Sequence, residues 1–152
     1  MKRSIACLVV LTSLVLVDAA PASAVVGLTV TADDFDSDVR VGSVTTVTVT
    51  VSAQDQPTSG PVHIRITARG GRVLEVDNLG FFVDCRERRG AGICRTVSPL
   101  EPYQIVELAA SVKVTGVAGR TEYLRVTATA TSPADGVSDH AVEVVPVSRR
   151  GG

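Results

Sequence analysis

Apolar and polar residues alternate one by one along most of this chain, the period-two pattern of half-buried β-strands. Val47, Val49 and Val51 occupy every second position of a run whose other positions are threonines, and both residue types are β-branched and favour strands. No segment keeps apolar residues at helical spacing for three turns. The sequence therefore predicts an all-β protein.

The alternating runs are separated by turn signals about every 8–12 residues, which is typical of a two-sheet Greek-key sandwich with an immunoglobulin-like fold. We expect about seven to nine strands, with Val62, Ile64, Ile66 and Ala68 facing inward on one of them. The predicted strands are residues 28–32, 43–53, 61–68, 73–76, 80–85, 93–97, 105–114, 121–131 and 139–147.

The first residues have the pattern of a secretory signal peptide. Lys2 and Arg3 precede an apolar run over residues 5–17, and Ala22-Ser23-Ala24 supplies a small-residue cleavage site. The apolar run is too short to span a bilayer, which takes about 20 residues. We therefore predict a signal peptide over residues 1–24, no membrane span, one domain over residues 25–147 and a frayed tail over residues 148–152.

Charge is nearly balanced in the predicted mature chain. Loss of Lys2, Arg3 and Asp18 with the signal leaves 13 basic and 15 acidic residues, for a formal charge of −2. Nucleic-acid and anionic-membrane binding both need a large basic surface. We therefore expect neither partner, and the absence of an LPxTG sorting motif favours a soluble single module, either secreted or associated with the cell wall.

Two cysteines, Cys85 and Cys94, remain in the mature chain because Cys7 lies in the signal peptide. They flank a short segment in which Gly90 and Gly92 can supply the positive φ angles of a tight loop. In an oxidising compartment such a pair should form a disulfide. Closing so short a loop stabilises the fold by about 3 kcal/mol on the chain-entropy model.

A resemblance to a known family emerges from the order of several segments. These are VTTVTVTVS, TSGPVHIRIT, the cysteine segment CRERRGAGIC, LEPYQ, the strand IVELAASVKV and RVTATATSPADGVSD. The order resembles the bacterial immunoglobulin-like repeat called domain of unknown function eleven, over most of residues 42–147. Its usual Asn-Gly-Pro turn is AQDQPTSG here, and its Pro-Gly is Pro102-Tyr103. The resemblance implies an immunoglobulin-like fold in a secreted or cell-surface protein, without a catalytic activity.

An acidic run is the candidate metal site. Asp33, Asp34, Asp36 and Asp38 place hard oxygens at nearly alternate positions, as in the start of a calcium-binding loop. The sixth position of that loop is Val39 instead of glycine. The other interpretation of the run is a solvated connection between the first two strands.

Four arginines, Arg86, Arg88, Arg89 and Arg95, gather in and beside the cysteine segment, where their forked donors could bind carboxylates, sulfates or phosphates. The alternative is that they only keep the hairpin soluble. If they bind, we expect the partner to be an unidentified protein or an anionic polymer of the cell envelope.

Catalytic signals are absent from the sequence, which predicts neither an enzyme nor a cofactor. His63 and His140 have no nucleophile motif beside them, and we predict that both are surface residues. Tyr103 and Tyr123 are predicted core or corner residues. The expected function is that of a monomeric, non-enzymatic binding or structural module. One alternative is a small-ligand carrier resembling the actinomycete chromoprotein apoproteins, and another is a secreted hydrolase.

Overall fold

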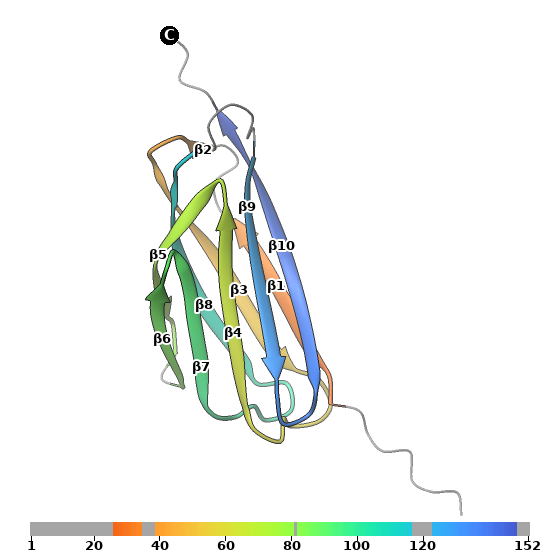
Figure 1. Ribbon diagram of the computed structural model, residues 1–152. Coiled ribbons are helices and arrows are strands. Elements are labelled where there is room, and N and C mark those ends of the chain that lie inside the picture. The colour runs from red at the N-terminus through yellow and green to blue at the C-terminus, as the bar shows by residue number, and fades with distance from the viewer. Residues whose placement is uncertain (1–25, 35–38, 81, 117–122, 149–152) are drawn as a thin grey trace, which may run out of the picture.

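The protein is a sandwich of two twisted β-sheets in the computed structural model, which describes residues 26–34, 39–80, 82–116 and 123–148 (Figure 1). No helix long and apolar enough to cross a membrane occurs among these residues. The described strands are β1 (Leu28–Asp34), β2 (Val39–Arg40), β3 (Val44–Ala53), β4 (Pro61–Arg69), β5 (Gly71–Asn78), β6 (Val83–Arg88), β7 (Ala91–Pro99), β8 (Ile105–Val114), β9 (Tyr123–Ser132) and β10 (Val137–Ser148).

One sheet has four strands in the order β1-β3-β8-β5, and the other has six in the order β2-β10-β9-β4-β7-β6. Neighbouring strands pair antiparallel except for the short parallel contact between β2 and β10. Most neighbours in a sheet are not consecutive in the sequence, because the chain crosses between the sheets after β1, β2, β3, β4, β5, β7 and β8. The predicted immunoglobulin-like Greek-key sandwich is thus confirmed.

The core lies between the sheets and consists of the apolar positions that alternation predicts. Val47, Val49 and Val51 of β3 are fully buried, and they belong to the same hydrophobic core as Ile64 and Ile66 of β4 in the other sheet. Burial of aliphatic side chains stabilises a protein by about 1.5–3 kcal/mol each relative to leaving them exposed. The same inward positions recur on the later strands: Val106, Leu108, Ala110, Val112 and Val114 on β8, and Leu124, Val126, Ala128 and Ala130 on β9.

Side-chain hydrogen bonds hold two connections between the sheets. Asn78, at the end of β5, donates from Nδ2 to the Val83 carbonyl at 2.8 Å, and its Oδ1 accepts the Gly80 N–H at 2.8 Å. At the passage from β3 to β4, the Asp135 carboxylate accepts the Ser59 N–H at 2.9 Å. In both connections, these side chains give hydrogen-bond partners to backbone N–H and C=O groups that are not paired within either sheet.

The structure differs from the expectations at several points. β1 continues through Asp33 and Asp34, and the two-residue strand β2 was not predicted, because neither segment has enough alternating apolar residues to reveal a strand. Ser148 belongs to β10 and is not part of a frayed tail. Tyr103 and Tyr123 are not in the core, since 69% and 52% of their surfaces are exposed. The predicted signal peptide and residues 149–152 lie outside the described residues.

Candidate functional site

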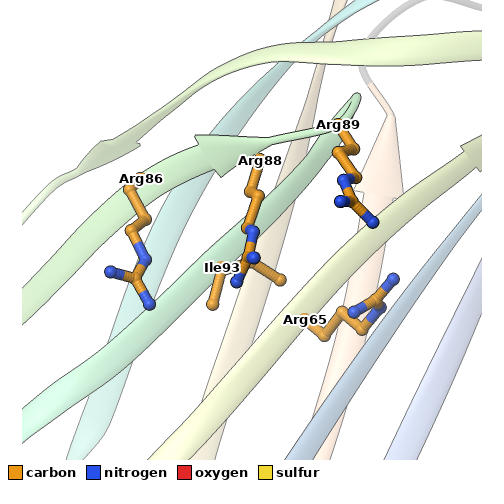
Figure 2. A pocket seen from close by; sticks show the side chains of 5 residues that line it. All are labelled: Arg65, Arg86, Arg88, Arg89 and Ile93. Atoms are coloured by element: carbon orange, nitrogen blue, oxygen red, sulfur yellow. The ribbon is translucent and has the colours of Figure 1, made fainter.

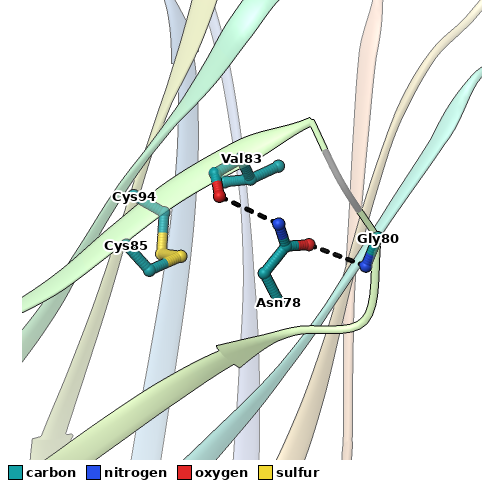
Figure 3. Close-up of a disulfide and its surroundings, with 5 residues drawn as sticks. All are labelled: Asn78, Gly80, Val83, Cys85 and Cys94. Atoms are coloured by element: carbon teal, nitrogen blue, oxygen red, sulfur yellow. Dashed lines mark hydrogen bonds between the residues drawn. A yellow bond between two sulfur atoms is a disulfide. The ribbon is translucent and has the colours of Figure 1, made fainter.

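The cysteine segment forms a disulfide-linked β-hairpin made of β6 and β7. Cys85 and Cys94 are direct partners across the two strands, with their Cα atoms 4.1 Å apart, and their sulfurs are bonded (Figure 3). The predicted local disulfide is therefore confirmed. It joins the middles of two paired strands, and the hairpin turn lies beyond it, because β6 continues to Arg88 and β7 begins at Ala91.

The hairpin turn consists of Arg89 and Gly90, with φ angles of 55° and 76°. Two positive φ angles in a two-residue turn are typical of a type I′ hairpin, whose twist matches that of the strands. Gly90 was correctly expected to supply a positive φ, but the second one comes from Arg89. Gly92 is required for another reason: a Cβ added there would lie 2.4 Å from Val76 Cγ2.

The turn also contacts the other sheet, which limits its movement. The Val73 N–H of β5 donates to the Gly90 carbonyl at 3.0 Å, and the Glu87 carboxylate accepts the Gly90 N–H. The hairpin is therefore held by the disulfide in its middle and by β5 at its tip. Side chains that project from its outer surface have a fixed backbone beneath them.

The outer surface of the hairpin and of its neighbour β4 carries a groove of about 450 Å³, the hairpin groove. Its lining residues are Arg65, Arg86, Arg88, Arg89 and Ile93. Figure 2 shows the four guanidinium groups arranged around Ile93, with Arg65 extending from β4 and the other three arginines coming from the hairpin. Arg65 and Arg86 both oppose Ile93, one from each side, in the strand register.

Beyond this groove, arginines cover the same outer face of the six-stranded sheet. Directly paired residues of neighbouring strands share a face, so the register identifies the residues that point outward. Asp84 is the sole carboxylate at the described outward positions of β4, β6, β7 and β9. The exposed arginines there are Arg65, Arg69, Arg86, Arg88, Arg95 and Arg125, and we call this surface the arginine face.

These guanidinium groups have no carboxylate partners in the described part of the chain. The structure records no ion pair between any of the six and a described acidic side chain. Asp84 directly opposes Arg95 in the register without approaching it closely enough to pair. Their positive charges are thus exposed to solvent. A guanidinium group can bind a planar anion through two parallel hydrogen bonds.

Three of the four predicted binding arginines, Arg86, Arg88 and Arg89, line the hairpin groove, and Arg95 lies next to it on the same face. Arg65 also lines the groove and is not among the predicted binding arginines. Its place between the inward-facing Ile64 and Ile66 puts it on the outer face, yet nothing in the sequence indicated that β4 pairs with β7. That pairing brings Arg65 beside the hairpin.

The candidate calcium site is not assembled among the described residues. Asp33 is exposed on the outer face of β1, whereas Asp34 alternates to the other face and accepts a hydrogen bond from Thr45 Oγ1 at 3.2 Å. Asp36 and Asp38 lie outside the described residues. Within the described ranges, no group of three or more metal-ligating side chains is placed to hold a metal ion.

Both histidines are exposed on the outer face of the six-stranded sheet. His63 opposes Arg95 on one side and Thr131 on the other, and His140 opposes Thr129. Their register partners place both histidines on the same face as the arginines. Neither histidine has a described carboxylate as its direct register partner.

Solved structures with the same architecture include a pilin, a cohesin and an uncharacterised protein, all at low sequence identity to this chain. The major pilin SpaD from Corynebacterium diphtheriae aligns with a TM-score of 0.54 at 14% identity, over 78% of this chain and 34% of the pilin. An uncharacterised protein from Nocardia farcinica with an immunoglobulin-like fold has a TM-score of 0.53 at 16% identity, over 78% of this chain and 97% of its own. A non-cellulosomal cohesin from the archaeon Archaeoglobus fulgidus has a TM-score of 0.50 at 13% identity, over 80% and 91%.

These similarities define the class of the protein as an immunoglobulin-like β-sandwich, and at such identities they establish the fold alone. The chain spans about a third of the length of the SpaD pilin. No protein-family model matches the sequence, and no curated protein matches it.

Proposed function

We propose that this protein is an extracellular, non-enzymatic module that binds an anionic component of the cell envelope in the hairpin groove. The observation that carries the proposal is the convergence of four guanidinium groups, those of Arg65, Arg86, Arg88 and Arg89, on one groove of a disulfide-tied hairpin. A scaffold that is ordered before binding loses less entropy when the ligand arrives. Arginine forks add geometric selectivity for carboxylate, sulfate or phosphate groups.

The extracellular setting is supported by the disulfide, because such bonds persist mainly in oxidising compartments. The signal-peptide pattern of residues 1–24 points the same way. The immunoglobulin-like folds of a bacterial pilin and a cohesin are compatible with this setting. Membership of the family called domain of unknown function eleven remains a prediction.

The backbone at the hairpin turn also supports a binding role. Arg89 adopts a left-handed conformation, which is costly for a residue with a Cβ and which asparagine or glycine tolerates better. Strained conformations of this kind gather at functional sites. An arginine therefore occupies a turn position at which glycine or asparagine would make the fold more stable.

The experiment compares binding of the wild-type protein and of an Arg86→Ser/Arg88→Ser/Arg89→Ser variant to envelope polymers from the producing cell. Each exposed ion pair contributes about 0.5–1 kcal/mol, so three losses should weaken binding about 10- to 100-fold. The melting temperature should not fall, since all three side chains are exposed. The control is Arg72→Ser/Lys113→Ser, which removes two positive charges from the other sheet. Undiminished binding by the hairpin variant would disprove the proposal.

The residues that line the hairpin groove argue against the alternative function, a small-ligand carrier. A chromophore carrier needs a cleft lined mainly by apolar and aromatic side chains, whereas the hairpin groove has four arginines and the single apolar residue Ile93. Organic extraction of the native protein, followed by absorption spectroscopy, separates the two proposals. A stoichiometric chromophore would favour the carrier.

A further inference from the structure

The arginine face extends well beyond the hairpin groove, to a pair of arginines that oppose each other directly. Arg69 of β4 and Arg125 of β9 are register partners, and both are exposed. Like charges in directly opposed positions of a sheet destabilise it. The pair therefore opposes folding, and an anion that lies between the two guanidinium groups would relieve the repulsion.

The outer face also presents hydroxyl groups among the arginines. Thr129 of β9 lies between Arg65 and His140 in the register, and Thr131 lies between His63 and Ser138. These threonines are half-buried at the level of the backbone, with longer arginine side chains beside them. A ligand held by the arginines would therefore meet neutral donors and acceptors between the charges.

The dimensions of the face indicate a long ligand. From β6 to β9 the face crosses three inter-strand steps, or about 14 Å, and Arg65 and Arg69 are separated by about 13 Å along β4. A single sulfate or carboxylate reaches one or two guanidinium groups at a time. Only a chain with repeated anionic groups can contact the hairpin groove and the Arg69–Arg125 pair together.

We propose that the ligand of the arginine face is an acidic polysaccharide that lies across β6, β7, β4 and β9. Its carboxylate or sulfate groups would bind the arginines, and its sugar hydroxyls would bind the threonines of β9. This inference rests on the proposed function and specifies the class of the anionic component. Single-stranded nucleic acid is disfavoured, because its binding uses successive stacked aromatic rings, and the described outward positions of these four strands offer only Tyr123, at the start of β9, and the imidazole of His63.

The test measures affinity for heparin oligosaccharides, from disaccharide to decasaccharide, and for a long inorganic polyphosphate. We expect the affinity of the wild-type protein to rise with oligosaccharide length until the chain spans the face. The Arg69→Ser/Arg125→Ser variant should bind the decasaccharide about tenfold more weakly, from two lost ion pairs. It should bind the disaccharide as the wild type does, because the hairpin groove is intact.

Two further variants separate a polysaccharide from a bare polyanion. Thr129→Val keeps the shape of the side chain and removes its hydroxyl, so it should weaken decasaccharide binding and leave polyphosphate binding unchanged. Arg72→Ser/Lys113→Ser removes the same number of charges from the other sheet and should bind the decasaccharide as the wild type does.

The outcomes distinguish this inference from the proposed function. Equal affinity for disaccharide and decasaccharide, or an unaffected Arg69→Ser/Arg125→Ser variant, would overturn the inference and leave the hairpin groove as a local anion site. Unchanged decasaccharide binding by Thr129→Val would refute the polysaccharide assignment. If none of these anions binds, both proposals fail.

Discussion

In both sheets, inward apolar residues alternate with outward polar residues, but the outward residues of the two sheets differ in charge. On the six-stranded sheet, the outward positions of β4, β6, β7 and β9 carry six arginines and one carboxylate, Asp84. On the four-stranded sheet the outward positions of β1 and β3 are mainly hydroxyl-bearing: Thr29, Thr31, Thr46, Thr48, Thr50 and Ser52. The charged residues of that second face are four carboxylates and two cations: Asp33, Glu75, Asp77, Glu107, Arg72 and Lys113.

The difference shows that the net charge of a chain does not describe its surface. The whole sequence has a formal charge of −1, and from this near-neutrality we expected neither nucleic acid nor an anionic membrane as a partner. Strand pairing nevertheless places arginines from four separate segments on one face, while most of the acidic residues lie elsewhere. The related prediction, that nucleic acid is not a partner, remains a prediction.

The largest effect is expected from a comparison of two adjacent residues of β4 that point to opposite sides. Ile64 is fully buried, so Ile64→Ala should lower the free energy of unfolding by about 2–5 kcal/mol. Arg65 is exposed, and Arg65→Ser should change stability by less than about 0.5 kcal/mol while weakening anion binding. Urea unfolding and a binding titration measure both quantities. A large stability loss in Arg65→Ser would mean that the outer face also supports the fold.

The disulfide should contribute about 3 kcal/mol to stability on the chain-entropy model. Cys85→Ser/Cys94→Ser should therefore unfold at lower denaturant concentration, and reduction of the wild-type protein should have the same effect. Because the bridge also holds the backbone under Arg86 and Arg88, anion affinity should fall even where the variant is fully folded. Affinity equal to that of the wild type would show that strand pairing alone orders the groove.

Two residues with left-handed backbones, Arg89 and Tyr103, allow a matched comparison. Tyr103 has a φ of 60° and occupies the third position of a turn closed by the Gln104 N–H on the Glu101 carbonyl, where glycine is preferred after proline. Arg89→Gly and Tyr103→Gly should each stabilise the protein by about 1 kcal/mol. Only Arg89→Gly should weaken anion binding, because Tyr103 does not line the hairpin groove. Equal binding by both variants would remove Arg89 from the site.

The smallest effect concerns Asp135, which ties the β9–β10 turn to the β3–β4 connection and so helps to hold the two sheets together. Hydrogen bonds from the Ser132 hydroxyl, and then from Ser59, lower the pKa of the Asp135 carboxyl below its usual value. Its stabilisation is therefore present above an unfolded-state pKa of about 3.9 and is lost as the pH falls through the lower folded-state pKa. Asp135→Asn should melt at a lower temperature than the wild type at neutral pH, and the two should converge in acid. A difference that persists in acid would contradict this account.

Much of the fold could be predicted because its signals are local. Alternating valine and threonine in residues 43–53 and alternating apolar residues in residues 105–114 identified β3 and β8, together with their inward faces. The cysteine pair identified the hairpin. Local signals were insufficient for β2, whose two residues are ordered by pairing with β10, and for Tyr103, whose exposure depends on the turn that holds it.

The sequence by itself determined the all-β class, the disulfide and the face on which most side chains of each strand lie, because a period of two and a short cysteine spacing are properties of neighbouring residues. Only the tertiary structure decided which strands are neighbours in a sheet. That choice places Arg65 beside the hairpin and Arg125 opposite Arg69, although each pair is separated by tens of residues in the chain. The arginine face is the product of non-local strand pairing, and no local pattern could have revealed it.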